Sequence, residues 1–143
     1  MSIRVAILWF WCVGSLAKAG TPPSKVPLVP VDVSDFSMTY DNNVIDKIWT
    51  SHTMAPYLQK ALDCLRCSGA RDTIKTYHGS YARRKISGID KWSKHSWALA
   101  IDLNWGLTQP EILIDCFESA GFIWGGRWEK RPDPMHFEIG DTE

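Results

Sequence analysis

Residues 93–104, SKHSWALAIDLN, decide the fold, because positions 98–104 alternate between two kinds of side chain. One set is large and apolar: Leu99, Ile101 and Leu103. The other set is small or polar: Ala98, Ala100, Asp102 and Asn104. Since successive side chains of a strand point to opposite faces, this pattern predicts a strand with one core face. The small neighbours leave room beside Asp102 for a bulky group.

Residues 132–140, PDPMHFEIG, alternate in the same way and predict a second strand, with His136 and Glu138 on its polar face. Residues 108–122 predict an amphipathic helix, with Pro110 suited to its first turn and Gly121 to its end.

Residues 44–67 are mostly helical in their periodicity, and Pro56 predicts a break or restart within them. Three residues before this segment are candidate N-caps: Asp41, Asn42 and Asn43. His52, inside the segment, is expected to be a surface or packing histidine rather than a ligand.

The N-terminal residues predict export. A basic start, an uncharged apolar stretch at residues 5–16 and the A-x-A site at residues 17–19 match the three parts of a secretory signal peptide. Residues 1–19 are therefore interpreted as a signal peptide, with an uncleaved anchor as the alternative. Four prolines between positions 22 and 30 make residues 20–31 an expected extended linker, and residues 32–143 the domain.

Charge and cysteine content narrow the possible functions. Lys and Arg together number 16, as do Asp and Glu, so nothing indicates an electrostatic interaction with nucleic acid. Cys12 lies in the leader, Cys64 and Cys67 form a single CxxC, and Cys116 stands alone. Small buried side chains are the favoured interpretation, while export would allow a Cys64–Cys67 or a Cys67–Cys116 disulfide.

Three residues form a candidate metal site. Asp102 and His136 project from polar strand faces, and His95 precedes the first strand in a loop that can fold back toward Asp102. Two imidazoles and one carboxylate are the ligand count of a catalytic zinc, with a fourth position open to water. Asp133 is the candidate base, and Arg83 or Arg84 is the candidate group for stabilising an oxyanion.

Three motifs, in order, resemble one family. SKHSWALAID (residues 93–102) resembles the SxHxxGxAxD motif of the zinc D-Ala-D-Ala carboxypeptidase family, which includes L-alanyl-D-glutamate endopeptidases among phage endolysins. GSYARRKISG (residues 79–88) looks like the family segment that ends in R-x-I-x-G. GFIWGGRWEKRPDPMHFEI (residues 121–139) resembles the endolysin-type ending, GFxWGGxW followed by D-x-M-H-F-E. The resemblance covers roughly residues 30–140.

The resemblance implies a role for each matched position. It implies one zinc ion held by His95, Asp102 and His136, with Asp133 as general base and Arg84, rather than Arg83, at the oxyanion. Ser93 matches the motif serine and is expected to support the site by hydrogen bonding. Glu138 is expected either to orient a ligand or to make a plain solvent contact. The implied fold is α+β and similar to that of D-Ala-D-Ala carboxypeptidases and hedgehog proteins, with a small antiparallel sheet carrying the metal and helices packed on one face.

Two features remain open beside the resemblance. Ala98 stands where the family motif has glycine, so a positive φ at this position would strain the start of the strand. Five tryptophans flank the motifs: Trp92, Trp97, Trp105, Trp124 and Trp128. They are interpreted as core and loop anchors, with a cleft wall for a peptide or sugar as the alternative.

The expected function is that of an exported zinc metallopeptidase acting on the peptidoglycan stem peptide, in the periplasm or cell wall. An L-alanyl-D-glutamate endopeptidase is favoured, and a D-alanyl-D-alanine carboxypeptidase is the alternative enzyme. A non-catalytic metal-containing module that binds the cell wall is the alternative of another class. Membrane contact is expected only through an uncleaved leader.

Overall fold

The computed structural model describes residues 20–140, so the expected leader at residues 1–19 lies outside the described residues. The elements are β1 (Leu28–Asp32), β2 (Thr39–Tyr40), β3 (Asn43–Val44), β4 (Lys47–Ser51), α1 (Ala55–Cys67), β5 (Ala100–Asp102), α2 (Glu111–Ala120), β6 (Phe122–Trp124) and β7 (His136–Ile139). Three short 3-10 helices complete the order: η1 (Arg71–Thr73) follows α1, η2 (Lys94–Trp97) precedes β5, and η3 (Gly125–Arg127) follows β6.

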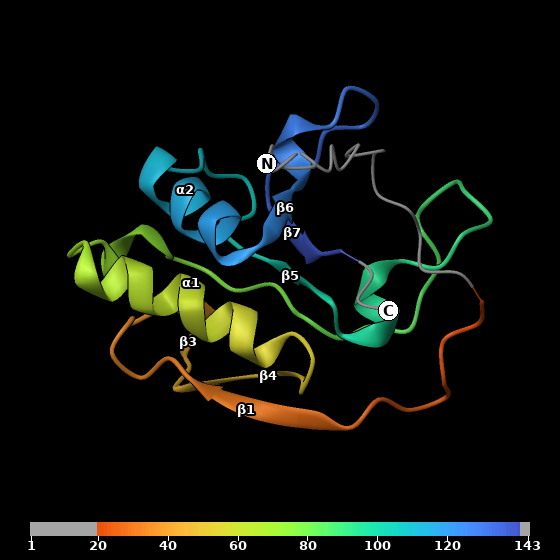
Figure 1. The fold of residues 1–143 in the computed structure, drawn as a ribbon, viewed down its shortest axis with the longest axis horizontal. Coiled ribbons are helices and arrows are strands. Elements are labelled where there is room, and N and C mark those ends of the chain that lie inside the picture. The colour runs from red at the N-terminus through yellow and green to blue at the C-terminus, as the bar shows by residue number, and fades with distance from the viewer. Residues whose placement is uncertain (1–19, 141–143) are drawn as a thin grey trace, which may run out of the picture.

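The fold is a small α+β arrangement of two helices and small antiparallel sheets, as predicted at this level. The central sheet has the order β5-β7-β6, and α1 and α2 lie side by side next to it (Figure 1). The apolar residues of β5 and β7 share one buried core with both helices: Ile101, Phe137, Ile139, Leu58, Leu62, Leu113 and Phe117. The alternation of the two strands thus leaves their polar face free to carry the site.

Two isolated bridges extend this sheet toward the β2–β3 hairpin. Thr39 pairs with Thr76 in parallel, and Tyr77 pairs with Leu103, the residue after β5, in antiparallel orientation. Residues 76–77 therefore lie between the hairpin and β5, and the hairpin is tied to the strand that carries Asp102.

The prediction of a helix over residues 44–51 is wrong. Residues 47–51 form β4, which pairs antiparallel with β1, and α1 begins only at Ala55. The side chains of β4 alternate, with Ile48 and Thr50 buried and Trp49 exposed. The sequence of this segment fits both a strand period and a helix period, and pairing with β1 selects the strand. Pro56, in the first turn of α1, fits the predicted restart.

Two further boundaries differ from the sequence prediction. Asp41 and Asn42 have φ values of 49° and 65° and form the two-residue turn of the β2–β3 hairpin, so they cap no helix. β1 begins at Leu28, so the last four residues of the predicted linker, 28–31, belong to the folded domain. Among the described residues, none of the helices has the length and apolarity needed to cross a membrane.

The disulfide joins Cys64 of α1 to Cys116 of α2, a pairing that the sequence analysis did not anticipate. Both predicted pairings, Cys64–Cys67 and Cys67–Cys116, required Cys67, which is an exposed free cysteine. The reason is the packing of α1 on α2, which brings Cys64 and Cys116 to a Cα–Cα distance of 5.5 Å. A contact between two helices that lie 52 residues apart cannot be inferred from local spacing.

We predict that replacing Cys64 and Cys116 together with alanine lowers the free energy of unfolding by about 2–4 kcal/mol, because the crosslink closes a long loop in the unfolded chain. Chemical denaturation followed by tryptophan fluorescence measures the change, and Cys67→Ala is the matched control, expected to leave the stability unaltered. Equal losses in the double variant and in Cys67→Ala would contradict the assignment of this crosslink.

Candidate metal centre

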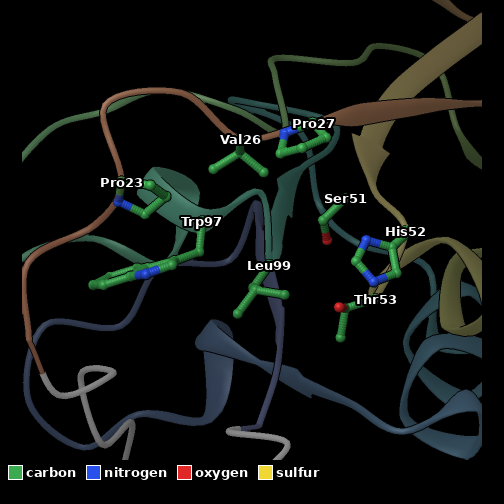
Figure 2. A pocket seen from close by; sticks show the side chains of 8 residues that line it. All are labelled: Pro23, Val26, Pro27, Ser51, His52, Thr53, Trp97 and Leu99. Atoms are coloured by element: carbon green, nitrogen blue, oxygen red, sulfur yellow. The ribbon is translucent and has the colours of Figure 1, made fainter.

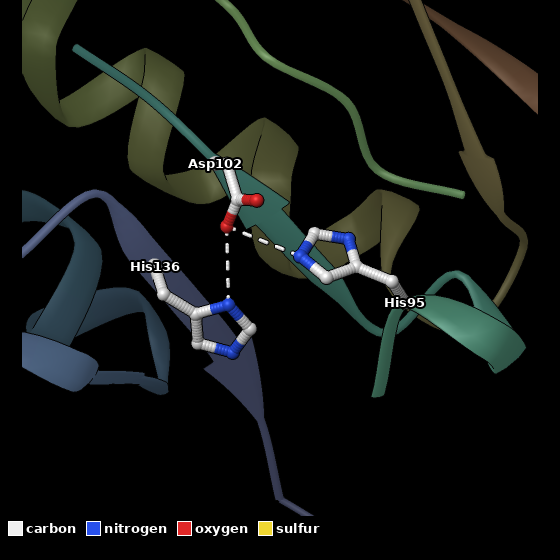
Figure 3. Close-up of side chains that lie close together, drawn as sticks. All are labelled: His95, Asp102 and His136. Atoms are coloured by element: carbon white, nitrogen blue, oxygen red, sulfur yellow. Dashed lines mark hydrogen bonds and ion pairs between the residues drawn. The ribbon is translucent and has the colours of Figure 1, made fainter. Parts of the chain in front are cut away.

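Three side chains from separate elements meet on the polar face of the central sheet (Figure 3). His95 comes from η2, Asp102 ends β5 and His136 begins β7, directly opposite Asp102 in the strand register. Asp102 Oδ1 lies 3.1 Å from His95 Nε2 and 3.1 Å from His136 Nδ1. All three residues are buried, and their candidate ligand atoms lie within 4.8 Å of one another.

The nitrogen of each imidazole that faces away from Asp102 is held by an acceptor. His95 Nδ1 lies 3.3 Å from the carbonyl oxygen of Ser80, and His136 Nε2 lies 2.8 Å from Glu138 Oε2. An N–H donated to each acceptor fixes the tautomer in which the other nitrogen presents its lone pair to the centre of the cluster. Glu138 is 3% exposed and contacts a candidate ligand, which excludes the alternative of a plain solvent contact.

The cluster has the donors and the spacing that a zinc ion requires. Two ligands that each lie about 2.0–2.1 Å from a tetrahedral zinc are about 3.3 Å apart, close to the separations around Asp102. Among the described residues, His95 Nε2 is a buried nitrogen whose geometry makes no hydrogen bond, although it faces the carboxylate. A buried polar atom without a partner is costly, and a metal ion at the centre of the cluster would satisfy it.

The electrostatics of the cluster favour a cation at its centre. Burial raises the pKa of Asp102, but the hydrogen bond from His136 and the adjacent His95 imidazole lower it more, to well below its usual range. Burial lowers the pKa of His136, while the carboxylates of Asp102 and Glu138 raise it to about 9. Without a metal, His136 therefore carries a proton at neutral pH, and metal binding must displace that proton.

Residues 87–139 match the family model for D-alanyl-D-alanine carboxypeptidase. Through these residues the chain is similar to the D-alanyl-D-alanine carboxypeptidase family. The resemblance inferred from the sequence is thereby confirmed, and it supports a hydrolase of the metallopeptidase type. The matched segment includes the whole cluster as well as Asp133 and Glu138. No curated protein and no solved structure matches the chain.

The other family-motif residues are joined to the elements that carry the cluster mainly by hydrogen bonds of their backbones. The Ser93 hydroxyl accepts a hydrogen bond from the His95 N–H at 3.3 Å, and Ser93 thereby caps the N-terminus of η2. The Arg84 carbonyl accepts a hydrogen bond from the Ser93 N–H at 3.0 Å, and the Arg84 side chain is exposed. The Asp133 carbonyl accepts from the His136 N–H at 3.1 Å, and Asp133 is partly buried. In the described part of the chain, no hydrogen bond or ion pair joins the Arg84 or Asp133 side chain to the cluster.

Sequence reasoning missed two contacts of the site. Ser80 acts through its carbonyl oxygen, and a carbonyl oxygen has no sequence signature. Ser80 itself lies in GSYARRKISG, the family-like motif at residues 79–88. The Trp128 ring lies 5.3 Å from the His136 ring, so this tryptophan packs against a candidate ligand. Trp97, at 8% exposure, belongs to the core, whereas Trp105 is 69% exposed. The interpretation of the tryptophans as anchors therefore holds for some of them and not for Trp105.

Ala98 has a φ of 52° and ends η2 in the left-handed conformation. This conformation is unfavourable for alanine, so the start of β5 is strained where the family motif has glycine. Two hydroxyls of the neighbouring β4 hold the strained peptide. Thr50 Oγ1 and Ser51 Oγ donate to the Ala98 carbonyl at 3.1 and 2.8 Å. β4 thereby fixes the path of the chain between His95 and Asp102.

A separate cavity of about 250 Å³ lies beside η2, between the N-terminal segment and the end of β4 (Figure 2). Its wall contains Pro23, Val26, Pro27, Ser51, His52, Thr53, Trp97 and Leu99, and none of the three clustered residues. His52 is exposed, as predicted for a histidine that is not a ligand of the cluster. This cavity is therefore distinct from the candidate metal centre.

We predict that Glu138→Gln weakens zinc binding about 10–100-fold, because it removes the carboxylate that orients His136. Zinc affinity is measured by competition with a chromogenic chelator. Affinity of the wild type should rise as the pH increases toward 9, where His136 loses its proton. In the variant the zinc affinity should rise at lower pH, because the Glu138 carboxylate no longer raises the pKa of His136. Glu111→Gln, exposed in the first turn of α2, is the matched control, and equal affinities in all three proteins would exclude the role of Glu138.

We predict that combining Thr50→Val with Ser51→Ala lowers the free energy of unfolding by about 1–3 kcal/mol, because the buried Ala98 carbonyl loses both donors and the Met54 N–H loses its acceptor. It should also weaken zinc binding, because the peptide next to η2 is no longer held. Thr53→Val serves as the control, since Thr53 makes no hydrogen bond to Ala98. A double variant with wild-type stability and zinc affinity would show that these hydroxyls do not position the site.

Proposed function

We propose that the protein is an exported zinc peptidase that hydrolyses an amide bond in the peptidoglycan stem peptide. The observation that carries the proposal is the buried group of His95, Asp102 and His136 inside the segment that matches the peptidase family. The fold type of D-Ala-D-Ala carboxypeptidases and hedgehog proteins is part of the same proposal, since the sheet and helices are compatible with it.

The three buried side chains would hold zinc, which when bound acidifies water and polarises a carbonyl. The residues of the chain supply the remaining functions. The Asp133 carboxylate, three residues before His136, takes the proton of the attacking water and delivers it to the leaving amine. The exposed Arg84 guanidinium, on the segment bonded to Ser93, stabilises the negative charge that develops on the carbonyl oxygen. Ser80 and Glu138 keep both imidazoles in the required tautomer.

The bond between L-Ala and D-Glu is the proposed site of cleavage. The support is the segment GFIWGGRW at residues 121–128, which resembles the ending found in endolysin-type endopeptidases. Trp128 from this segment packs on His136, so the segment forms part of the wall of the site. Removal of the terminal D-Ala by a carboxypeptidase is the alternative.

The proposed location is the periplasm or the cell wall. The Cys64–Cys116 disulfide supports export, because disulfides persist mainly in oxidising compartments. It agrees with the signal peptide proposed from residues 1–19. The proposed partner is the stem peptide, and a membrane is contacted only if the leader remains attached.

We predict that the purified zinc-loaded protein digests peptidoglycan and exposes new N-termini on D-Glu, identified by mass spectrometry. Release of D-Ala instead would support the carboxypeptidase. Asp133→Ala should lower kcat by a factor of about 10²–10⁴ while zinc remains bound, because the general base is lost. Asp115→Ala, on α2, is the control and should retain activity. A wild type as inactive as Asp133→Ala, with zinc bound in both, would favour the non-catalytic binding module.

A further inference from the structure

An exposed aromatic pair lies close to the candidate metal centre. The Trp105 side chain is 69% exposed, and its ring meets the His78 ring edge to face at a centroid distance of 6.1 Å. The His78 ring is itself fixed, because its Nε2 lies 2.9 Å from the Thr76 hydroxyl. A large, ordered and solvent-exposed aromatic surface is typical of a binding site rather than of a core anchor.

The backbone connects this pair directly to Asp102. The His78 N–H donates to the Asp102 carbonyl at 2.9 Å, and the Asp102 N–H donates to the Gly79 carbonyl at 3.0 Å. His78 therefore lies opposite a candidate ligand on the adjacent segment, and Trp105 follows that ligand by three positions. A ligand held by the pair would therefore lie on the two segments that border Asp102.

A polar cavity of about 460 Å³ continues from His78 toward the β2–β3 hairpin. It is lined by Thr39, Tyr40, Asp41, Asn42, Thr76 and His78. The lining offers hydroxyl, amide, carboxylate and imidazole groups, and Asp41 is its one acidic residue. The volume is in the range of small-molecule sites, and the absence of lysine and arginine from the lining favours an uncharged polar ligand over a phosphate.

We propose that Trp105, His78 and this cavity form a subsite for a sugar ring of the glycan strand that carries the stem peptide. The faces of a pyranose ring present C–H groups that pack on an aromatic ring, while its hydroxyl and acetamido groups hydrogen-bond to polar side chains. This subsite rests on the proposed function, since it assumes a substrate in which peptide and glycan are joined.

The position of the subsite agrees with cleavage after L-Ala. The stem peptide is attached to the glycan through its L-Ala, so one residue separates the sugar's lactyl group from the L-Ala–D-Glu bond. One extended residue spans at most about 3.6 Å, so the lactyl group and a single residue are all that separates the sugar ring from the bond that is cleaved. The terminal D-Ala bond lies several residues further from the glycan, where a neighbouring sugar site would not be reached.

Binding of the glycan unit tests the subsite without requiring activity. We predict that the N-acetylglucosamine–N-acetylmuramic acid disaccharide, with its lactyl carboxyl group capped as an amide, shifts the indole N–H signal of Trp105 in the NMR spectrum of the zinc-loaded, ¹⁵N-labelled protein. The signal is assigned with Trp105→Ala. Trp105→Ala and His78→Ala should each weaken disaccharide binding about tenfold or more. Trp49→Ala, which removes an exposed tryptophan of β4, should bind as the wild type does.

The corresponding kinetic experiment compares a disaccharide-linked stem peptide with the same peptide lacking the sugar. Trp105→Ala should lower kcat/KM about tenfold for the linked substrate and less than about twofold for the free peptide. If the disaccharide shifts Trp105 but the wild type hydrolyses neither substrate, the subsite stands and the proposed peptidase function fails. If the disaccharide leaves the Trp105 signal unmoved, or Trp105→Ala affects both substrates equally, the subsite is excluded.

Discussion

The contact between Asp102 and His136 across β5 and β7 is the one on which the rest of the site depends. The strand register places the two residues opposite each other, and a slip of one residue would turn either side chain to the core face. With the register fixed, Asp102 reaches both imidazoles from one oxygen atom. Burying a carboxylate is costly unless positive charge compensates it, so this arrangement is built for a cation.

β5 is too short to hold this register by its own hydrogen bonds, and neighbouring segments fix it from several directions. Residues 78–79 bond to Asp102 on the edge of β5 away from β7. The hydroxyls of β4 hold the Ala98 carbonyl before the strand begins. Beneath the apolar face, the Cys64–Cys116 disulfide joins the two helices that support the sheet. The strain at Ala98 is therefore contained by contacts from a different part of the chain.

The sequence was sufficient for the parts of the site that follow from local periodicity. The alternation of residues 98–104 and 132–140 placed Asp102, His136 and Glu138 on polar strand faces, and the family motifs added His95, Asp133 and Arg84. It was insufficient wherever a distant partner decides the outcome. Residues 47–51 form a strand because β1 pairs with them, Cys64 bonds to Cys116 because two helices pack, and Ser80 contributes only a carbonyl oxygen. Such contacts have no signal in local spacing.

We expect His95, Asp102 and His136 together to hold one zinc ion. X-ray absorption at the zinc edge of the purified protein tests it most directly, because the technique distinguishes nitrogen and oxygen ligands from sulfur by distance. We expect one zinc per chain, with imidazole and carboxylate ligands at about 2.0–2.1 Å. Replacing His136 with alanine should reduce the imidazole contribution. Zinc bound through sulfur at about 2.3 Å, or a spectrum unchanged in the His136 variant, would show that these three residues do not hold the metal.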